Sequence, residues 1–251
     1  ARFVQPAFLT PTTSLTLNPF ILRQTEPAFT VNRAGGNLIL QHQLGRNYVV
    51  GSVYAYENVQ LDEQSVSDRN IEGLVKLYNK SSISLNLSHN TTDQIMSPTK
   101  GSLKSVLLKY SGLWGSDYQY TKAIFELRKY QRIGRPVLAL RLQVGNILSH
   151  DQSKYIPVEE RFYSGGSQSV RGWERFQLGP KDEGGVPSGG RGMLVGNIEL
   201  RTPIFKSFAV TTFLDMGNVW QNQDNLRLMD LRYAAGIGLR YTTPIGPIRI
   251  D

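Results

Sequence analysis

Residues 231–241 read Leu-Arg-Tyr-Ala-Ala-Gly-Ile-Gly-Leu-Arg-Tyr, and they indicate the fold class of the chain. The odd-numbered residues are apolar or aromatic, and the residues between them are Arg, Ala or Gly. A period of two places successive side chains on opposite faces of an extended strand. Residues 138–144 repeat the pattern, with Ala139, Arg141 and Gln143 between Leu and Val. Because helical periodicity is absent, the chain is predicted to be all-β.

The polar face of these strands separates two all-β architectures. A soluble sandwich and a membrane barrel both give strands with one apolar face. Here the opposite face carries Arg, Gln, Glu and Gly, and not the mixture of Lys, Glu and Thr that is typical of a wet surface. This favours an antiparallel transmembrane β-barrel whose polar side chains face an internal lumen.

The composition excludes several classes of protein. The chain has 251 residues and no cysteine, so disulfide, zinc-thiolate and thiol-nucleophile chemistry are not expected. No apolar run reaches the ~18 residues of a membrane helix, but the alternating faces of barrel strands cancel in a hydropathy average. The formal charge of +8 comes from scattered basic residues, so nucleic acid is not an expected partner.

Twelve segments show strand-like patterns between turn residues. The predicted strands are residues 1–9, 13–24, 29–44, 47–60, 80–92, 101–113, 119–132, 136–147, 191–203, 208–220, 231–243 and 246–251. Tight turns are expected at 44–47, 133–135 and 243–246, and long connections at 61–79 and 148–190. Short turns at one end and long loops at the other are typical of outer-membrane barrels. A loop as long as 148–190 is usually functional or disordered.

Catalysis is not predicted. His42, His89 and His150 lie far apart in the sequence without metal-ligand spacing, and no nucleophile elbow or phosphate-binding loop is present. Glu159 and Glu160 are adjacent acids in a loop, which are usually solvated. We therefore expect no catalytic residue, no metal and no cofactor.

The long loop contains a composite motif. Residues 161–173 read Arg-Phe-Tyr-Ser-Gly-Gly-Ser-Gln-Ser-Val-Arg-Gly-Trp, and Gly179-Pro180 follow. An aromatic residue before Gly165-Gly166, the tetrad Val170-Arg171-Gly172-Trp173 and a Gly-Pro form a specific combination. It resembles the sixth extracellular loop of the BamA/TamA superfamily of outer-membrane insertases and translocases, also known by its bacterial surface antigen barrel domain.

Further segments carry the same resemblance, which is clear from about residue 80 onward and generic before it. Pro98-Thr99-Lys100-Gly101 is similar to a turn of the family, three strands before the loop. Residues 197–203, 213–220 and 236–251 are similar to the strands that follow the loop. The resemblance implies a sixteen-stranded barrel, of which residues 1–251 would be about the last twelve strands. We expect one barrel domain that is incomplete at both ends, with the first strands and periplasmic POTRA domains upstream of Ala1.

The resemblance also implies a role for the loop, which in this family folds into the lumen so that the tetrad arginine meets acidic residues of the wall. Alternation alone places Glu199 and Asp215 on the polar faces of their strands, where an acid avoids lipid. The hypothesis is that Arg171 bridges Glu199 and Asp215, because a guanidinium can serve two carboxylates. The alternative is that each of the three is a solvated lumen charge.

Glycines support such a packed loop. Gly165, Gly166 and Gly172 admit backbone conformations that other residues avoid. Gly236 and Gly238 lie on the polar face of one strand and have two readings: they leave space for the loop, or they relieve curvature in the sheet.

The function implied by the resemblance is the assembly of other outer-membrane β-barrel proteins at a lateral seam without nucleotide. Its partners would be unfolded client proteins, the lipid bilayer of a Gram-negative outer membrane and accessory envelope proteins. The alternatives are a two-partner secretion translocase, the membrane barrel of a patatin-type phospholipase fusion, and a passive porin. A lumen plugged by residues 148–190 argues against the porin.

Overall fold

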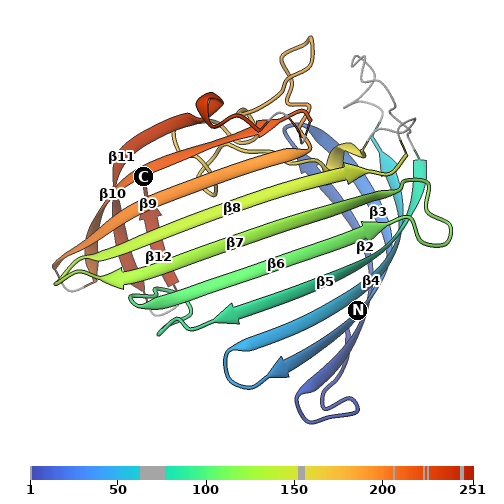
Figure 1. Cartoon of the computed structure of the whole chain (residues 1–251), viewed down its shortest axis with the longest axis horizontal. Helices are drawn as coiled ribbons and strands as arrows, with labels where there is room; N and C mark the ends of the chain where they lie inside the picture. The colour runs from blue at the N-terminus through green and yellow to red at the C-terminus, as the bar shows by residue number, and fades with distance from the viewer. Residues whose placement is uncertain are drawn as a thin grey trace.

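The computed structural model of the chain describes residues 2–62, 77–151, 156–205, 207–222, 224, 226–243 and 246–251. These residues form one antiparallel sheet of twelve strands in chain order (Figure 1). The strands are β1 (Phe3–Gln5), β2 (Thr13–Glu26), β3 (Phe29–Leu44), β4 (Tyr48–Leu61), β5 (Leu77–Asn90), β6 (Gly101–Ser111), β7 (Tyr120–Arg132), β8 (Val137–Ser149), β9 (Gly192–Phe205), β10 (Phe208–Trp220), β11 (Arg232–Thr243) and β12 (Gly246–Ile250). Within this part of the chain, the single-turn 3₁₀ helices η2 (Val158–Glu160) and η4 (Leu228–Asp230) lie in connections. No helix among these residues is long and apolar enough to cross a membrane.

The all-β, antiparallel prediction and its twelve strands are confirmed. The first strand is the exception, because it ends at Gln5 and the prediction of a strand to residue 9 is wrong. Pro6 has no N–H to donate to a ladder, and Ala7 and Leu9 have φ angles of +54° and +62°, which no strand accommodates. Closure into sixteen strands stays a prediction.

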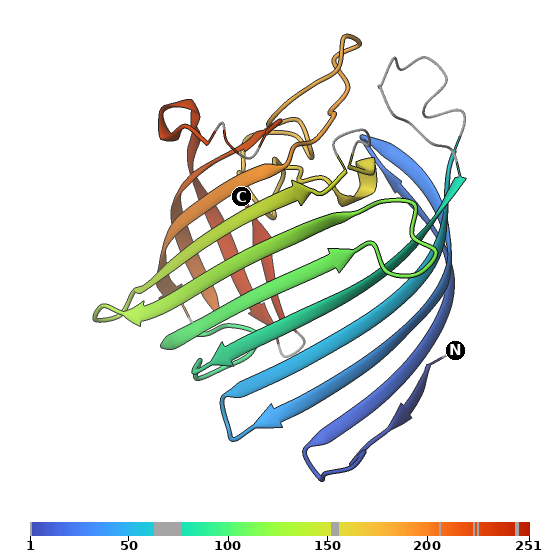
Figure 2. The same cartoon turned by 45° about the vertical axis from the view of Figure 1, so that its right-hand side comes forward.

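The sheet curls strongly, and its two ends differ in their connections (Figure 2). The strand ends Leu61 and Leu77 lie at one end of the sheet, together with residues 112–119 and the described parts of the connections that follow β8 and β10. The turn 45–47 and the connection 133–136 lie at the other end. Residues 27–28 are a tight turn at the long-loop end, and residues 91–100 are a ten-residue connection at the short-turn end, so the predicted division holds apart from these two connections. Most of the predicted loop 61–79, residues 152–155 of the predicted loop 148–190, and the middle of the predicted turn 243–246 fall outside the described residues.

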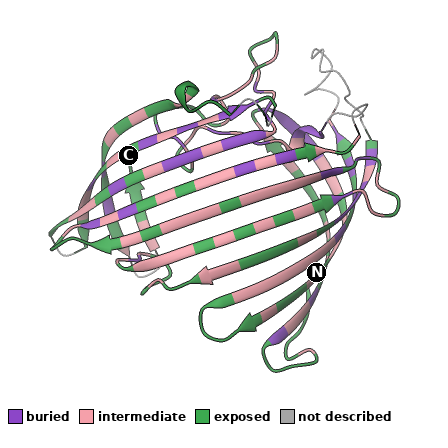
Figure 3. Cartoon of the chain, viewed as in Figure 1, coloured by how far each residue is buried: buried purple, intermediate pink, exposed green. Residues whose placement is uncertain are grey.

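The outer face of the sheet is a continuous apolar surface because the strand register aligns the apolar positions. Leu85 lies opposite Leu108, and Ile198 lies opposite both Leu140 and Leu214. All five side chains are exposed. Along β6, half-buried and exposed residues alternate in sequence, as pink and green bands in Figure 3. An exposed apolar surface of this extent is expected of a face that contacts lipid.

The buried core lies on the other face, between the sheet and residues 156–178 of the long connection. Val170 and Leu178 from this connection are 0% and 2% exposed. They belong to one apolar cluster with Ile147, Val195 and Val219 of β8, β9 and β10. The loop therefore packs on one side of this core and the strands on the other, in place of the two packed layers of a sandwich.

Two neighbouring residues of β5 test which face meets lipid. Leu85 points outward and Asn86 points inward. Leu85→Arg in the full-length protein is expected to lower the free energy of unfolding in lipid vesicles by up to about 4 kcal/mol, because a charge on the lipid face is costly. Asn86→Arg, the matched control, is expected to be close to neutral. Equal effects in a denaturant titration would contradict this assignment of the faces.

Candidate functional site

The connection between β8 and β9 folds back onto the concave face of the sheet and pairs with itself (Figures 1 and 2). Isolated antiparallel bridges join Phe162 to Gly190 and Ser164 to Leu178. The tip 165–173 projects from the second bridge. It is closed by a hydrogen bond of 2.7 Å from the Gly166 N–H to the Trp173 carbonyl oxygen. The tip is thus a defined hairpin-like structure that presents the tetrad to the wall.

Glycine is required where this hairpin turns. Gly165 has a φ of +103°, and a Cβ there would collide with the carbonyl oxygen of Glu174. Gly166 and Gly172 also have positive φ angles, of +91° and +81°. Residues with a Cβ are strained in this region. The three glycines singled out in the sequence therefore take backbone conformations that residues with a Cβ avoid.

Asp215 of β10 receives Arg171 in a bidentate arrangement. Nε and Nη2 of Arg171 donate hydrogen bonds of 2.7 and 2.8 Å to Oδ2 and Oδ1 of Asp215. The backbone N–H of Arg171 donates a third, of 3.0 Å, to Oδ2. Asp215 is 0% exposed and Arg171 6%. This fork geometry fixes both the position and the orientation of the loop residue.

The remaining nitrogen of the guanidinium faces two further acids. Nη1 of Arg171 lies 3.0 Å from Oε1 of Glu199 on β9 and 3.2 Å from Oδ2 of Asp251. The guanidinium carbon of Arg171 lies over the ring of Phe213, 3.6 Å from the ring centroid, in cation–π geometry. The structure thus brings Arg171, Glu199 and Asp215 together, and it adds Asp251 and Phe213, which the sequence analysis did not include. Phe213 shares the face of Asp215 two residues away, which was the available signal for it.

Glu199 is shared among three basic side chains. Its Oε2 lies 2.9 Å from Nη2 of Arg201 and 3.3 Å from Nη2 of Arg240 on β11. The tetrad therefore joins a buried network that spans β9, β10 and β11. Burial alone would lower the pKa of Arg171, but the hydrogen bonds and charge of Asp215 raise it, so the guanidinium stays charged.

Two strand glycines make room for loop side chains. A Cβ on Gly217 of β10 would lie 2.9 Å from Cγ2 of Val170, which packs directly over this position. A Cβ on Gly145 of β8 would collide with the ring of Phe162. Trp173, the last tetrad residue, is by contrast 37% exposed. Glycines on the wall thus leave the space that apolar side chains of the loop occupy.

The atoms nearest to Gly236 and Gly238 belong to the sheet and not to the loop, and the two readings of these glycines stay predictions. The nearest atoms to a Cβ on Gly236 belong to the ring of Phe213, on the neighbouring strand. Those nearest to a Cβ on Gly238 belong to Asp251 and Ile250. Both glycines admit close neighbours from within the sheet.

The expectation that Glu159 and Glu160 are solvated is wrong. Their side chains are 2% and 8% exposed, and both contact Lys80. The three histidines lie apart, with His42 near Thr13 and His150 near Thr121. Within the described part of the chain, no group of three or more His, Cys, Asp or Glu side chains is placed to hold a metal ion.

Comparison with known proteins identifies relatives along the whole chain. The profile of the Omp85 superfamily domain matches residues 1–251. The chain is 28% identical over 262 residues to the outer membrane protein assembly factor BamA of Nitratidesulfovibrio vulgaris, an alignment that covers 99% of this chain and 32% of the relative. It is 30% identical over 196 residues to BamA of Neisseria meningitidis, covering 64% of this chain and 24% of that protein. The chain therefore spans a third or less of these relatives.

A eukaryotic relative and a solved structure extend the comparison. The sorting and assembly machinery component 50 homolog of Xenopus tropicalis is 29% identical over 125 residues, covering 50% of this chain and 26% of that protein. The crystal structure of BamA from Haemophilus ducreyi lacking POTRA domains 1–3 has a similar fold, with a TM-score of 0.83 and 21% identity over 99% of this chain and 56% of the other. The predicted family is confirmed, and the similarity extends before residue 80.

Substitution of Arg171 tests how much the buried network contributes to the free energy of unfolding. Arg171→Ala in the full-length protein should lower the free energy of unfolding by about 3–5 kcal/mol, because Asp215 is left buried and unpaired. Arg171→Lys should cost roughly 1.5–3 kcal/mol, because it keeps the charge and loses the fork. Arg175→Ala, which removes an exposed pair with Glu26, is the control at about 0.2–1 kcal/mol. Denaturant unfolding measures all three, and an Arg171→Ala value as small as the control would contradict the burial of the network.

The close packing of Phe162 against Gly145 can also be tested by substitution. Gly145→Ala should destabilise the protein by about 1–3 kcal/mol through overpacking against Phe162. Phe162→Leu in the same background should recover part of this loss. Gly51→Ala is the matched control, because the nearest atom to its Cβ is Leu40 O, at an ordinary 3.8 Å. Additive effects of the Gly145 and Phe162 changes would exclude the contact.

Proposed function

The chain belongs to the Omp85 superfamily, and from this we propose that it is the barrel domain of an outer-membrane protein assembly factor. The whole-chain similarity to BamA carries the proposal. In it, the protein resides in the outer membrane of a Gram-negative bacterium and assists unfolded β-barrel clients to enter the bilayer. The exposed apolar face of the sheet supports an integral membrane position.

In the proposed mechanism the client is recognised through its backbone. A sheet edge presents N–H and C=O groups in a row, so an incoming strand can pair there by β-augmentation. β1 and β12 stand at the two edges of the described sheet. A full barrel of sixteen strands, with POTRA domains upstream and accessory envelope proteins beside it, would bring the first and last strands together in a lateral seam. The folding of the client supplies the free energy, and no nucleotide or catalytic residue takes part.

The tetrad would then set the shape of the wall beside that seam. Arg171 joins β9 and β10, and through Glu199 it reaches β11. A charged network of this kind fixes strand positions near the C-terminal edge while the edge itself remains available. The tetrad residues Val170 to Trp173 are thus proposed as supports of assembly, without contact to the client.

Reconstitution of the full-length protein in lipid vesicles tests the proposal. It should accelerate the folding of an unfolded outer-membrane barrel client by about tenfold or more, equivalent to at least ~1.4 kcal/mol of barrier. Added ATP or GTP should change nothing. A passive porin at equal density is the control, and the readout is the protease-resistant, bilayer-integrated client. A rate equal to that of the porin vesicles would refute the proposal, and a client enclosed in the vesicle interior would favour the secretion translocase instead.

A further inference from the structure

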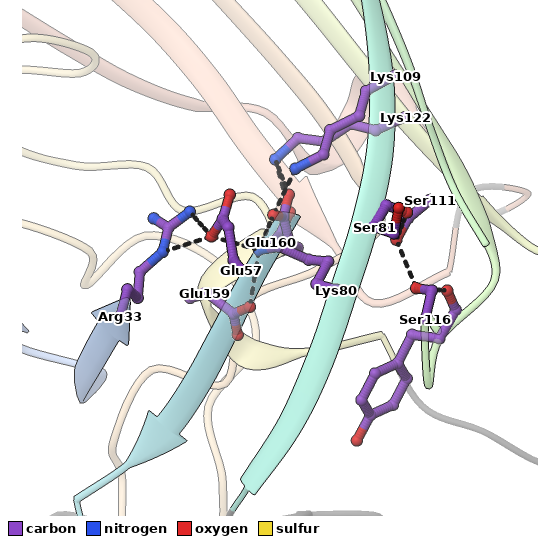
Figure 4. Close-up of polar contacts among 11 residues, drawn as sticks. Arg33, Glu57, Lys80, Ser81, Lys109, Ser111, Ser116, Lys122, Glu159 and Glu160 are labelled. Atoms are coloured by element: carbon purple, nitrogen blue, oxygen red, sulfur yellow. Dashed lines mark hydrogen bonds and ion pairs between the residues drawn. The ribbon is translucent and has the colours of Figure 1, made fainter. Parts of the chain in front are cut away.

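A second charged cluster connects the loop to a different part of the wall (Figure 4). Lys80, Lys109 and Lys122, here called the lysine triad, come from β5, β6 and β7. The carboxylate of Glu160 in η2 lies between them. Nζ of Lys80 and Nζ of Lys109 lie 2.7 and 2.6 Å from Oε1 of Glu160, and Nζ of Lys122 lies 3.6 Å from Oε2. Lys122 also donates a 2.7 Å hydrogen bond to the backbone carbonyl oxygen of Glu160.

The cluster is buried, so its charges depend on one another. The Lys80 side chain is 0% exposed and that of Glu160 8%. Burial alone would raise the pKa of the Glu160 carboxyl, but the three ammonium groups outweigh it and hold that pKa well below its usual range. A buried charge that loses its partner is strongly destabilising. Glu160 is therefore bound to the wall as an anion and not merely placed beside it.

Without the loop, the strand register would leave like charges close together on the inner face of the sheet. Lys109 and Lys122 lie directly opposite each other across β6 and β7, and like charges in that position destabilise a sheet. Glu57 of β4 also faces the triad, 3.5 Å from Lys80, but it is engaged by Arg33 of β3. Among the described residues, Glu160 is the acid that contacts all three lysines. The three lysines of the wall thus form a binding site for a carboxylate, and the loop supplies that carboxylate from Glu160.

This contact is separate from the tetrad in sequence and in space. Glu160 lies eleven residues before Arg171 and meets β5–β7, whereas Arg171 meets β9 and β10. Phe162, between them, packs against Gly145 of β8. The loop is therefore attached at both ends of a path that crosses the concave face.

We propose that Glu160 is a positioning residue that anchors the first half of the loop to the lysine triad independently of Arg171. The inference deepens the proposed function, on which its functional half rests: a loop attached at two points holds β5–β7 and β9–β10 in a fixed relation during client assembly. Glu159 has a lesser role, because its contact to Lys80 is longer, at 3.4 Å.

Hydrogen–deuterium exchange on the full-length protein tests the anchor. Glu160→Gln should accelerate exchange in residues 156–163 by about 100-fold, while the tetrad 170–173 changes by less than about threefold. Glu183→Gln, at an exposed acid of the same loop, is the matched control and should change neither segment. Unchanged exchange in 156–163 overturns the proposal, and equal acceleration of both segments overturns the independence of the two anchors.

A second variant guards against loss of folding. Glu160→Gln with Lys109→Met removes one charge of each sign and relieves the opposed lysine pair, so the barrel should fold while residues 156–163 still exchange rapidly. With equal amounts of folded barrel, the client folding rate should fall by about tenfold. An unchanged rate would overturn the positioning role. If the wild-type protein does not accelerate client folding, the proposed function fails, whereas the exchange comparison still decides whether Glu160 is an anchor.

Discussion

The burial of one positive charge from a loop constrains most of this structure. Arg171 is removed from water on the concave face, and a buried guanidinium is tolerated only where carboxylates meet its fork. Asp215 and Glu199 satisfy this condition from adjacent strands, with Asp251 close by. The loop must then reverse at Gly165 and pack Val170 over Gly217. The path of the loop, the glycines beneath it and the division of the core between loop and sheet all follow from placing that charge.

The strands could be predicted from sequence because each position of a barrel strand has one of two environments. Strand-like patterns between turn residues therefore marked all twelve strands, and alternation marked the inward faces of Glu199 and Asp215. The first strand was overestimated because Ala7 and Leu9 look extended in sequence, whereas their positive φ angles depend on how the turn closes. The pairing of Arg171 with its two predicted partners, Glu199 and Asp215, came from a family resemblance, since spacing alone allowed solvated charges equally well.

The second cluster could not be predicted, and the reason is physical. Two adjacent glutamates in a loop read the same whether they face water or three lysines, because burial depends on the path of the loop. The informative signal was in the register: once β6 and β7 are paired, Lys109 lies opposite Lys122. An inward pair of like charges calls for an anion between them. The contact of Asp251 with Arg171 was not predicted for a related reason, because it depends on how β12 is placed against β11.

The shared register of the outer face has a consequence for how such a chain can change over time. From Leu85 through Leu108, Leu140 and Ile198 to Leu214, each apolar residue on this face depends on parity within its own strand. Losing one residue inside a strand inverts every side chain beyond that point, turning leucines inward and arginines toward lipid. Losing two preserves the parity. Length variation among descendants of this sequence should therefore accumulate in the connections, and within strands it should come in even steps.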